Sequence, residues 1–333
     1  MIWFQRKRTK RTNNIWYSSS MSAKKTLFTG LQPSGDFHLG NYFGALEPFK
    51  KEYENYESFL MVADYHALTS LRDPEFIRKN TLNAVRAYLA IGVDPKKVVI
   101  FKQSEVSEHT ELAWIFNCLV TVPFLMQAHA YKDKVAKGLE ANAGLFTYPM
   151  LMASDILLYD ADVVPVGEDQ RQHIEYAREA ATKFNNAYKE VFKEPKELIL
   201  ESVGVVPGTD GKKMSKSYGN TIPLFGSKEE VRKAVMSIVT DSDGEVPENV
   251  YAIHALLKDK EDLDALYKEK KGKYKDLKEA LVEDLESFFG PMRERYESIS
   301  DEEVLAVLKE GQVKAKEVAS KKMVDVRKAV GVA

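Results

Sequence analysis

The stretch KTLFTGLQPSGDFHLGN, residues 25–41, places a short apolar run directly before a glycine-rich turn and the start of a helix. The run that ends at Gly30 predicts a buried strand, and the pattern becomes helical from Asn41 to about Tyr53. A strand that leads through a glycine-rich loop into a helix is the opening unit of a parallel α/β sheet.

The alternation of strand and helix continues to about residue 226. Further strands are predicted in the apolar runs SFLMVADYHAL, KVVIFKQSEV and ADVVPVGEDQ. A helix is expected from about Asp73, because Pro74 suits a first helical turn. We therefore expect an α/β fold over residues 24–226, a Rossmann-like doubly wound parallel sheet covered by helices on both faces.

The last third of the chain has a different pattern. Capping boxes start two helices there, one with Ser227 and Glu230 and one with Ser300 and Glu303. Lysine-rich helical segments lie between them, and no segment reads convincingly as a strand. We expect an appended α-helical domain over residues 227–333.

The composition limits the class of protein. The 333 residues are 44% hydrophobic and 29% charged, with a net charge of −2, so any RNA binding must use local basic patches. No apolar run is long enough to cross a bilayer. The single cysteine, Cys118, excludes a disulfide within the chain and sites built on several thiolates, and we expect it to be a buried thiol in a reducing compartment.

The first 23 residues carry five Lys or Arg residues and no Asp or Glu. Three interpretations stay open, namely a disordered tail or over-extended reading frame, an organellar targeting segment, and an RNA-contacting arm. We expect residues 1–23 to be a basic, disordered extension, with the fold starting near Lys24. Whether translation begins at Met1 or at Met21 stays open as well.

The segment HLGN, His38–Asn41, indicates a ligand site at the first turn. Gly30, Gly35 and Gly40 let the backbone approach a ligand, and the helix start directs free N–H groups toward it. The glycine spacing does not fit the dinucleotide fingerprint, and the residues after Gly35 do not fit a P-loop. Taken alone, His38 can also be an ordinary surface histidine.

Two carboxylates stand where a ligand could use them. Asp169, which follows a buried strand, can accept hydrogen bonds from ribose hydroxyls, or with Glu168 it can simply favour the positive end of the next helix. Asp155 lies in an apolar helical run three residues after Met152, so both can face one pocket. Its alternative role is a structural ion pair with an arginine.

The loop TDGKKMSKSYGN, residues 209–220, carries three lysines, Lys212, Lys213 and Lys216, between glycines. Such a composition is found in ordinary solvated loops. It also suits a lid that closes over a strongly anionic ligand such as a triphosphate.

Together these segments resemble the class I aminoacyl-tRNA synthetases. HLGN resembles the first motif of the class, His-Ile-Gly-His, with Asn41 in the last place, and KMSKS, Lys213–Ser217, matches the second motif letter for letter. The stretches GLQPSGDFHLGNYFGAL, TYPMLMASDILLYDADVVPVGEDQRQHIE and KKMSKS resemble tryptophanyl-tRNA synthetases of the bacterial and organellar type. The resemblance runs from about Lys24 to the end of the chain. It implies a ligase that activates L-tryptophan with ATP to tryptophanyl-adenylate and transfers it to tRNA.

The resemblance also implies site residues. Those implied for catalysis are Lys213, Lys216, Ser215, Lys132, His38 and Asn41. Those implied for ATP are Gln32, Pro33, Ser34, Gly40, Asn41, Gly167, Glu168, Asp169, Val206, Lys213, Met214, Ser215, Lys216 and Ser217. Those implied for tryptophan are Asp155, Phe28, His66, Tyr148, Met152, Val164, Val166 and Gln170. Asp155 would accept the indole N–H, but a carboxylate also accepts from a phenol, so residue chemistry alone leaves tyrosine open.

The resemblance further implies Mg²⁺ that enters with ATP, no structural metal, tRNA and L-tryptophan as partners, a homodimer and no membrane association. Residues 227–333 would bind the anticodon, with the last helix packing back on the catalytic domain, and residues 145–159 are either a subunit interface or core. The expected compartment is the cytoplasm, or the mitochondrial matrix if residues 1–20 are a transit segment.

Two other functions compete with this interpretation. A free-standing nucleotidyltransferase or amino-acid-activating paralogue would share the His-x-Gly-His type of loop, but it would not need the lysine-rich helical domain. A non-catalytic RNA-binding protein could keep the fold, but the phosphate-binding residues of both motifs are intact.

Overall fold

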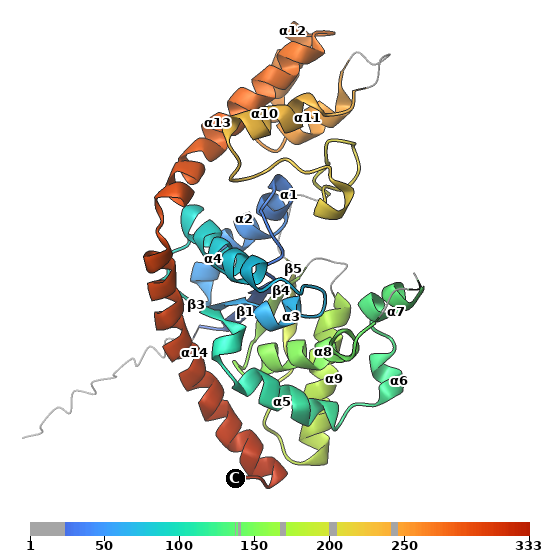
Figure 1. The fold of residues 1–333 in the computed structure, drawn as a ribbon, viewed down its shortest axis with the longest axis vertical. Coiled ribbons are helices and arrows are strands. Elements are labelled where there is room, and N and C mark those ends of the chain that lie inside the picture. Colours follow the sequence, from blue (N-terminus) through green and yellow to red (C-terminus); the bar gives the residue numbers. More distant parts are fainter. Residues whose placement is uncertain (1–23, 137, 139–140, 167–170, 200–204, 241–245) are drawn as a thin grey trace, which may run out of the picture.

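The computed structural model describes residues 24–136, 138, 141–166, 171–199, 205–240 and 246–333. Its five parallel strands form one sheet in the order β3-β2-β1-β4-β5 (Figure 1). The strands are β1 (Thr26–Leu31), β2 (Glu57–Val62), β3 (Val98–Lys102), β4 (Val163–Val166) and β5 (Lys196–Ile199). The order changes direction between β1 and β4, which confirms the doubly wound fold and marks the switch point where such sheets bind ligands.

Helices cover both faces of this sheet. On one face lie α1 (Leu39–Asn41), the π-helix Tyr42–Leu46, α2 (Glu47–Glu52) and α4 (Pro74–Ala90). On the other face lie α5 (Glu108–Asn117), α8 (Ala143–Leu157) and α9 (Arg171–Ala187). Short helices complete this part, namely Tyr53–Asn55, α3 (Asp64–Ala67), Gln103–Glu105, α6 (Val122–Leu125), α7 (His129–Ala136) and Lys216–Tyr218.

The period of two along each strand divides the buried side chains between two cores. Leu27 and Leu60 pack with α2 and α4. Their neighbours Phe28 and Phe59 pack with α5, α8 and α9 on the other face. Because both faces are covered, the inner strands read as continuous apolar runs, and this is why the sequence pattern located them.

The strand β5 was not predicted from the sequence. Its residues KELI are half-buried or exposed, because β5 lies at the edge of the sheet. The other edge strand, β3, carries an apolar run because α14 (Asp301–Val330) packs against it, whereas the residues of β5 stay partly accessible and left no such run in the sequence.

The remaining helices are α10 (Lys228–Met236), α11 (Glu248–His254), α12 (Lys260–Glu269), α13 (Tyr274–Ser298) and α14 (Asp301–Val330). The first three gather with the start of α13 beyond the parallel sheet (Figure 1). The capping box of Ser227 and Glu230 is present at the start of α10. At α14 the Ser300 side chain accepts the Glu303 N–H.

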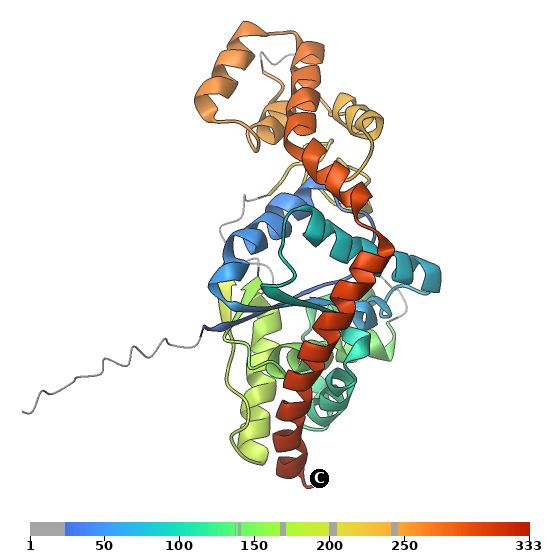
Figure 2. The same ribbon diagram turned by 90° about the vertical axis from the view of Figure 1, so that its left-hand side faces the viewer.

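The long helix α14 runs from this helical part past β3 to the opposite end of the molecule (Figures 1 and 2). Leu308 belongs to the core on the α4 side of the sheet and Ala315 to the core on the other side, so α14 crosses the edge at β3 between them. Gly311 lies at this crossing. A Cβ atom there would stand 1.7 Å from the carbonyl oxygen of Ile100, so only glycine permits the approach.

Polar contacts continue the attachment of α14 toward its end. The Arg327 guanidinium donates to both carboxylate oxygens of Glu111 in α5, at 2.7 and 2.5 Å. The C-terminal helix therefore packs on the sheet domain through apolar, backbone and charged contacts. Among the described residues no helix combines the length and the apolar character that a membrane span requires.

One local prediction was wrong. Cys118, expected to be buried, is exposed, because α5 ends at Asn117 and the thiol follows the helix on the same side as the exposed Trp114. The helix expected from Asn41 to about Tyr53 is present, although it begins at Leu39 and includes a π-helical turn.

Candidate active site

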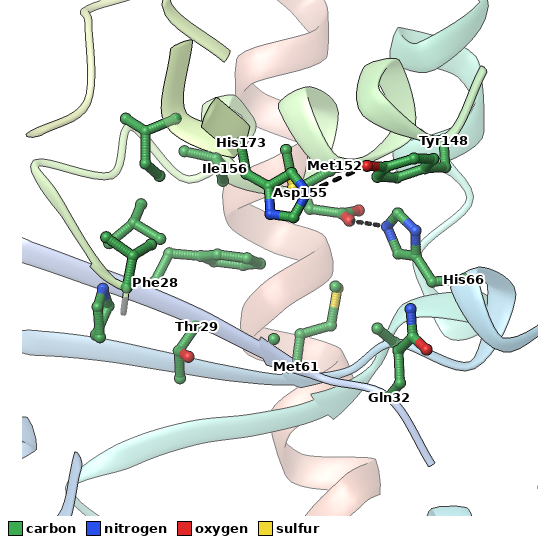
Figure 3. Close-up of a pocket in the computed structure, with 16 residues that line it drawn as sticks. Phe28, Thr29, Gln32, Met61, His66, Tyr148, Met152, Asp155, Ile156 and His173 are labelled. Carbon is green, nitrogen blue, oxygen red and sulfur yellow. Dashed lines mark hydrogen bonds and ion pairs between the residues drawn. The ribbon is translucent and has the colours of Figure 1, made fainter. Parts of the chain in front are cut away.

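A cavity of about 330 Å³ opens at the C-terminal ends of β1, β2 and β4, between α8 and α9 (Figure 3). Sixteen residues line it, and they are Phe28, Thr29, Gly30, Gln32, Met61, Ala63, His66, Tyr148, Met152, Asp155, Ile156, Val164, Pro165, Val166, His173 and Ile174. The cavity lies at the switch point of the sheet, where the loops after neighbouring strands diverge. Its lining is mainly apolar with a few polar groups, which is typical of a small-molecule site.

The structure brings most of the predicted tryptophan-site residues to this cavity. Those that line it are Phe28, His66, Tyr148, Met152, Asp155, Val164 and Val166. Gln170 lies outside the described residues. Gln32, which was predicted to contact ATP, also lines this cavity.

Asp155 is the buried anion of the cavity, with 2% of its surface exposed. His66 Nε2 lies 2.8 Å from Asp155 Oδ2, while Gln103 Nε2 and His109 Nδ1 lie 2.8 and 2.6 Å from Oδ1. Its partners are therefore two histidines and an amide rather than the arginine of the alternative interpretation. Burial raises the pKa of Asp155, but the hydrogen bonds from His109 and His66 outweigh burial and lower the pKa to about 2. An ionised carboxylate can only accept, so it offers the cavity a hydrogen-bond acceptor.

Tyr148 and His173 form a second polar pair on the cavity wall. The Tyr148 hydroxyl lies 3.1 Å from His173 Nε2, and the two rings meet edge to face (Figure 3). Burial raises the pKa of Tyr148 to about 12, so the phenol keeps its proton at neutral pH. This pair presents polar groups beside the charged Asp155.

The HLGN segment starts α1 directly after the first turn. Asn41 Oδ1 accepts the N–H of His38 at 3.1 Å, so the residue that departs from the class motif helps to hold the start of the helix. His38 is buried, and its Nδ1 has no hydrogen-bond partner among the described residues. Burial, and next the charge of Lys216, lowers the pKa of His38 to about 4. The imidazole is therefore neutral at pH 7 and can offer one N–H to a ligand.

The lysine loop lies directly on the HLGN segment. The Leu39 N–H donates to the carbonyl of Ile222 at 3.1 Å, and the Gly40 N–H donates to Met214 Sδ at 3.3 Å. Lys216 Nζ donates to the Ser34 carbonyl at 3.2 Å. The two signature segments, more than 170 residues apart in the chain, thus form one surface beside the cavity.

Asn220 holds the lysine loop in shape. Its side-chain oxygen accepts the Ser215 N–H at 2.8 Å, and its amide donates to Asp210 at 2.7 Å and to the Lys213 carbonyl at 3.1 Å. Asn220 is 2% exposed, and a Cβ on Gly208 would clash with it at 2.3 Å. Sequence reasoning did not single out Asn220, although it quoted the residue as the end of the loop.

The other predicted residues are more scattered. The Lys213 side chain is exposed, and the Ser215 and Ser217 hydroxyls lie 2.9 Å apart. Val206 is buried, and its carbonyl accepts the Met214 N–H; Pro33 is buried in the first turn. Lys132 is an exposed residue of α7, and its side chain forms no hydrogen bond or ion pair with any described residue. The predicted ribose segment Gly167, Glu168 and Asp169 lies outside the described residues.

Sequence reasoning missed the partners of Asp155 and Tyr148. Gln103 follows β3, and His109 lies in the first turn of α5, so neither stands near Asp155 in the chain. The only local signal was the position of Gln103 at a strand end, in the segment FKQSEV. No local pattern marks His109 or His173.

Comparison with known proteins gives a consistent result. Residues 21–293 match the family model described as tRNA synthetases class I (W and Y). The chain is 46% identical over 318 residues to a tryptophan–tRNA ligase of Fusobacterium nucleatum, covering 92% of this chain and 98% of that protein.

Solved structures are similar as well. A crystal structure of Campylobacter jejuni tryptophanyl-tRNA synthetase, complexed with ADP and tryptophan, matches with a TM-score of 0.87 and 42% identity, covering 92% of this chain and 99% of that one. A tyrosyl-tRNA synthetase of Archaeoglobus fulgidus, complexed with L-tyrosine, matches with a TM-score of 0.63 at 20% identity, covering 83% of this chain and 91% of that one. The second likeness concerns the fold alone.

Proposed function

The chain belongs to the class I tRNA synthetases for tryptophan and tyrosine, and from this membership we infer that it activates L-tryptophan with ATP and transfers the tryptophanyl group to tRNA. The observation that carries the choice of tryptophan is the high identity to tryptophan–tRNA ligases over nearly the whole chain. The mainly apolar cavity with a single buried carboxylate supports it, because an indole needs apolar walls and one acceptor for its N–H.

In the first step the tryptophan carboxylate attacks the α-phosphorus of ATP, and pyrophosphate leaves with the electrons of the broken bond. Such a displacement needs positioning and charge stabilisation rather than a protein nucleophile. We assign the charge stabilisation to Lys216 and Lys213 of the lysine loop. We expect His38 to donate a hydrogen bond to the ligand from its neutral imidazole N–H. The contact of this loop with the HLGN segment supports these roles, because it places Lys216 beside the first turn.

The Mg²⁺ of this proposal enters bound to ATP, as part of the substrate. Within the described residues no group of three or more His, Cys, Asp or Glu side chains could hold a metal ion. Phosphate oxygens and water are the usual Mg²⁺ ligands when a protein offers no dedicated cage.

In the second step a hydroxyl of the terminal tRNA ribose attacks the adenylate carbonyl, and AMP leaves. We propose that residues 227–333 contact the anticodon, which the six lysines between residues 268 and 278 support.

We also propose a homodimer. Exposed apolar side chains around a cavity of about 300 Å³, Leu68 and Trp114 among them, support it; Trp114 is 71% exposed. From the candidate interface 145–159, Thr147, Tyr148 and Leu151 line this cavity, while most of the later residues are buried within the chain itself. The proposed compartment is the cytoplasm, with the mitochondrial matrix as the alternative if residues 1–20 are a transit segment.

The test is amino-acid-dependent exchange of pyrophosphate into ATP, measured without tRNA for all twenty amino acids and followed by tRNA charging. We expect exchange with tryptophan alone and charging of a tryptophan tRNA. Exchange with tyrosine would overturn the choice of amino acid. Exchange without charging would favour an amino-acid-activating paralogue.

Asp155→Asn is expected to raise the KM for tryptophan about 10- to 100-fold and to change the KM for ATP by less than about threefold, because only tryptophan loses a hydrogen bond to a charged acceptor. Steady-state exchange kinetics with each substrate varied in turn will measure both constants. Equal increases in the two constants would mean that Asp155 supports the fold of the site and does not contact tryptophan.

A further inference from the structure

A chain of buried polar groups continues behind Asp155, outside the cavity. His109 Nδ1 lies 2.6 Å from Asp155 Oδ1, and His109 Nε2 lies 2.9 Å from the hydroxyl of Tyr159. His109 is fully buried and Tyr159 is 2% exposed. Neither residue lines the cavity, so neither can touch a bound amino acid directly.

The acceptor capacity of Asp155 is almost filled by the protein. A carboxylate accepts about four hydrogen bonds. Oδ1 faces two partners that lie outside the cavity, Gln103 and His109, whereas Oδ2 faces only His66, which lines the cavity (Figure 3). The remaining acceptor position therefore belongs to Oδ2, on the cavity side.

The proton positions along the chain follow from the charge of Asp155. An ionised carboxylate cannot donate, so His109 must carry its proton on Nδ1. In an imidazole with one proton, Nε2 is then an acceptor, and the Tyr159 hydroxyl can donate to it. Burial first, then the charges of Asp155 and Glu108, raises the pKa of Tyr159 far above its usual range, so the hydroxyl keeps the proton that it donates.

The ring of Tyr159 is fixed by its neighbours. It stacks on Phe28, with centroids 5.3 Å apart and planes at 15°, and it also contacts Phe59 and Phe101. Phe28 itself lines the cavity. The hydroxyl at the far end of the chain is therefore held in place by aromatic packing, and it fixes the orientation of the His109 ring.

We propose that Tyr159 is a positioning residue for tryptophan recognition, which acts through His109 to keep the open acceptor position of Asp155 Oδ2 directed at the indole N–H. The inference rests on the proposed function and deepens it. Without the Tyr159 hydroxyl, His109 Nε2 becomes a buried acceptor without a donor, and nothing holds that side of the ring. The imidazole can then turn, the Nδ1–H that fixes Oδ1 moves with it, and the carboxylate loses its direction toward the indole.

The test compares tryptophan with 3-(benzothiophen-3-yl)alanine, which has nearly the same shape but no N–H. The native enzyme should have a KM about 10- to 100-fold lower for tryptophan than for this analogue in pyrophosphate exchange, the size of one hydrogen bond to a charged group. Tyr159→Phe keeps the ring and removes the hydroxyl. We expect it to raise the KM for tryptophan about tenfold, to leave the KM for the analogue and for ATP within about threefold, and so to reduce the discrimination.

Tyr176→Phe is the matched control, because the Tyr176 hydroxyl is also buried but has no hydrogen-bond partner among the described residues. We expect it to keep the native discrimination. A Tyr159→Phe enzyme that loses the same factor for tryptophan and for the analogue would show a purely structural role and overturn the proposal. Unchanged kinetics would overturn it as well.

A second pair of variants, at His109, tests the proposal even if Tyr159→Phe does not fold. Asparagine and leucine have similar shapes, but only His109→Asn keeps an N–H near the place of Nδ1. We expect His109→Asn to keep most of the discrimination and His109→Leu to lose it; equal discrimination in the two folded variants would overturn the proposal. If the native enzyme does not distinguish tryptophan from the analogue, then Asp155 does not contact the indole N–H. That result would refute the premise taken from the proposed function.

Discussion

Lys216→Ala is expected to lower the rate of tryptophanyl-adenylate formation by about 10²- to 10³-fold, the usual loss when one charge contact to a transition state is removed. Lys216 Nζ lies 3.2 Å from the Ser34 carbonyl, beside the HLGN segment, so its ammonium stands at the first turn, where the proposed triphosphate would lie. The leaving pyrophosphate gains negative charge as the bond breaks, and a cation at that place is worth more in the transition state than in the ground state. Single-turnover formation of the adenylate, measured by rapid quench, gives this rate directly.

The control for this variant is Lys212→Ala in the same loop. Lys212 is exposed, and its side chain forms no hydrogen bond or ion pair with a described residue, so we expect its removal to change the rate by less than about threefold. The KM for tryptophan should stay near the native value in both variants, because the cavity residues are unchanged. If Lys216→Ala forms adenylate as fast as Lys212→Ala, the lysine loop takes no part in the chemical step.

Gly311→Ala is expected to lower the free energy of unfolding by about 3–5 kcal/mol, which is large for the addition of one methyl group. The new Cβ would stand 1.7 Å from the oxygen and 2.6 Å from the carbon of the Ile100 carbonyl. Both are backbone atoms of β3, so no change of side-chain rotamer can relieve the clash. The helix α14 must move away from the sheet, and the apolar contacts of Leu308 and Ala315 on the two sides of the crossing weaken with it.

Urea unfolding followed by circular dichroism measures this loss through the shift of the midpoint. Gly44→Ala is the matched control, because Gly44 is also in a helical segment and a Cβ there would meet nothing within 4 Å. Alanine favours the helix over glycine by up to about 1 kcal/mol, so the control should be as stable as the native protein or slightly more stable. A midpoint for Gly311→Ala that equals the control would mean that α14 does not approach β3 as closely as described.

Much of the catalytic fold could be predicted from local patterns. The inner strands β1, β2 and β4 and the edge strand β3, which α14 covers, each left an apolar run in the sequence. The start of α4 could be predicted because Asp73 and Pro74 form a local cap. The edge strand β5 and the exposure of Cys118 could not, because each depends on what the rest of the chain covers.

In the candidate site, too, some features could be predicted from the sequence and others came only from the structure. Met152 and Asp155 share a helix at a spacing of three, so their common orientation toward one cavity followed from the period of the helix. His66, Gln103 and His109 reach Asp155 from 89, 52 and 46 residues away. No periodicity relates residues at such separations, so the partners of the carboxylate came only from the structure.

By itself, then, the sequence determined the doubly wound sheet, the two signature segments and the common face of Met152 and Asp155. These are properties of short windows, where the hydrophobic period and the turn residues act locally. The tertiary structure alone decided the contact of Met214 with Gly40, the hydrogen bonds that orient Asp155, and the crossing of α14 over β3 at Gly311. Each of these depends on the close packing of segments far apart in the chain, and at such contacts a few tenths of an ångström separate a hydrogen bond from a clash.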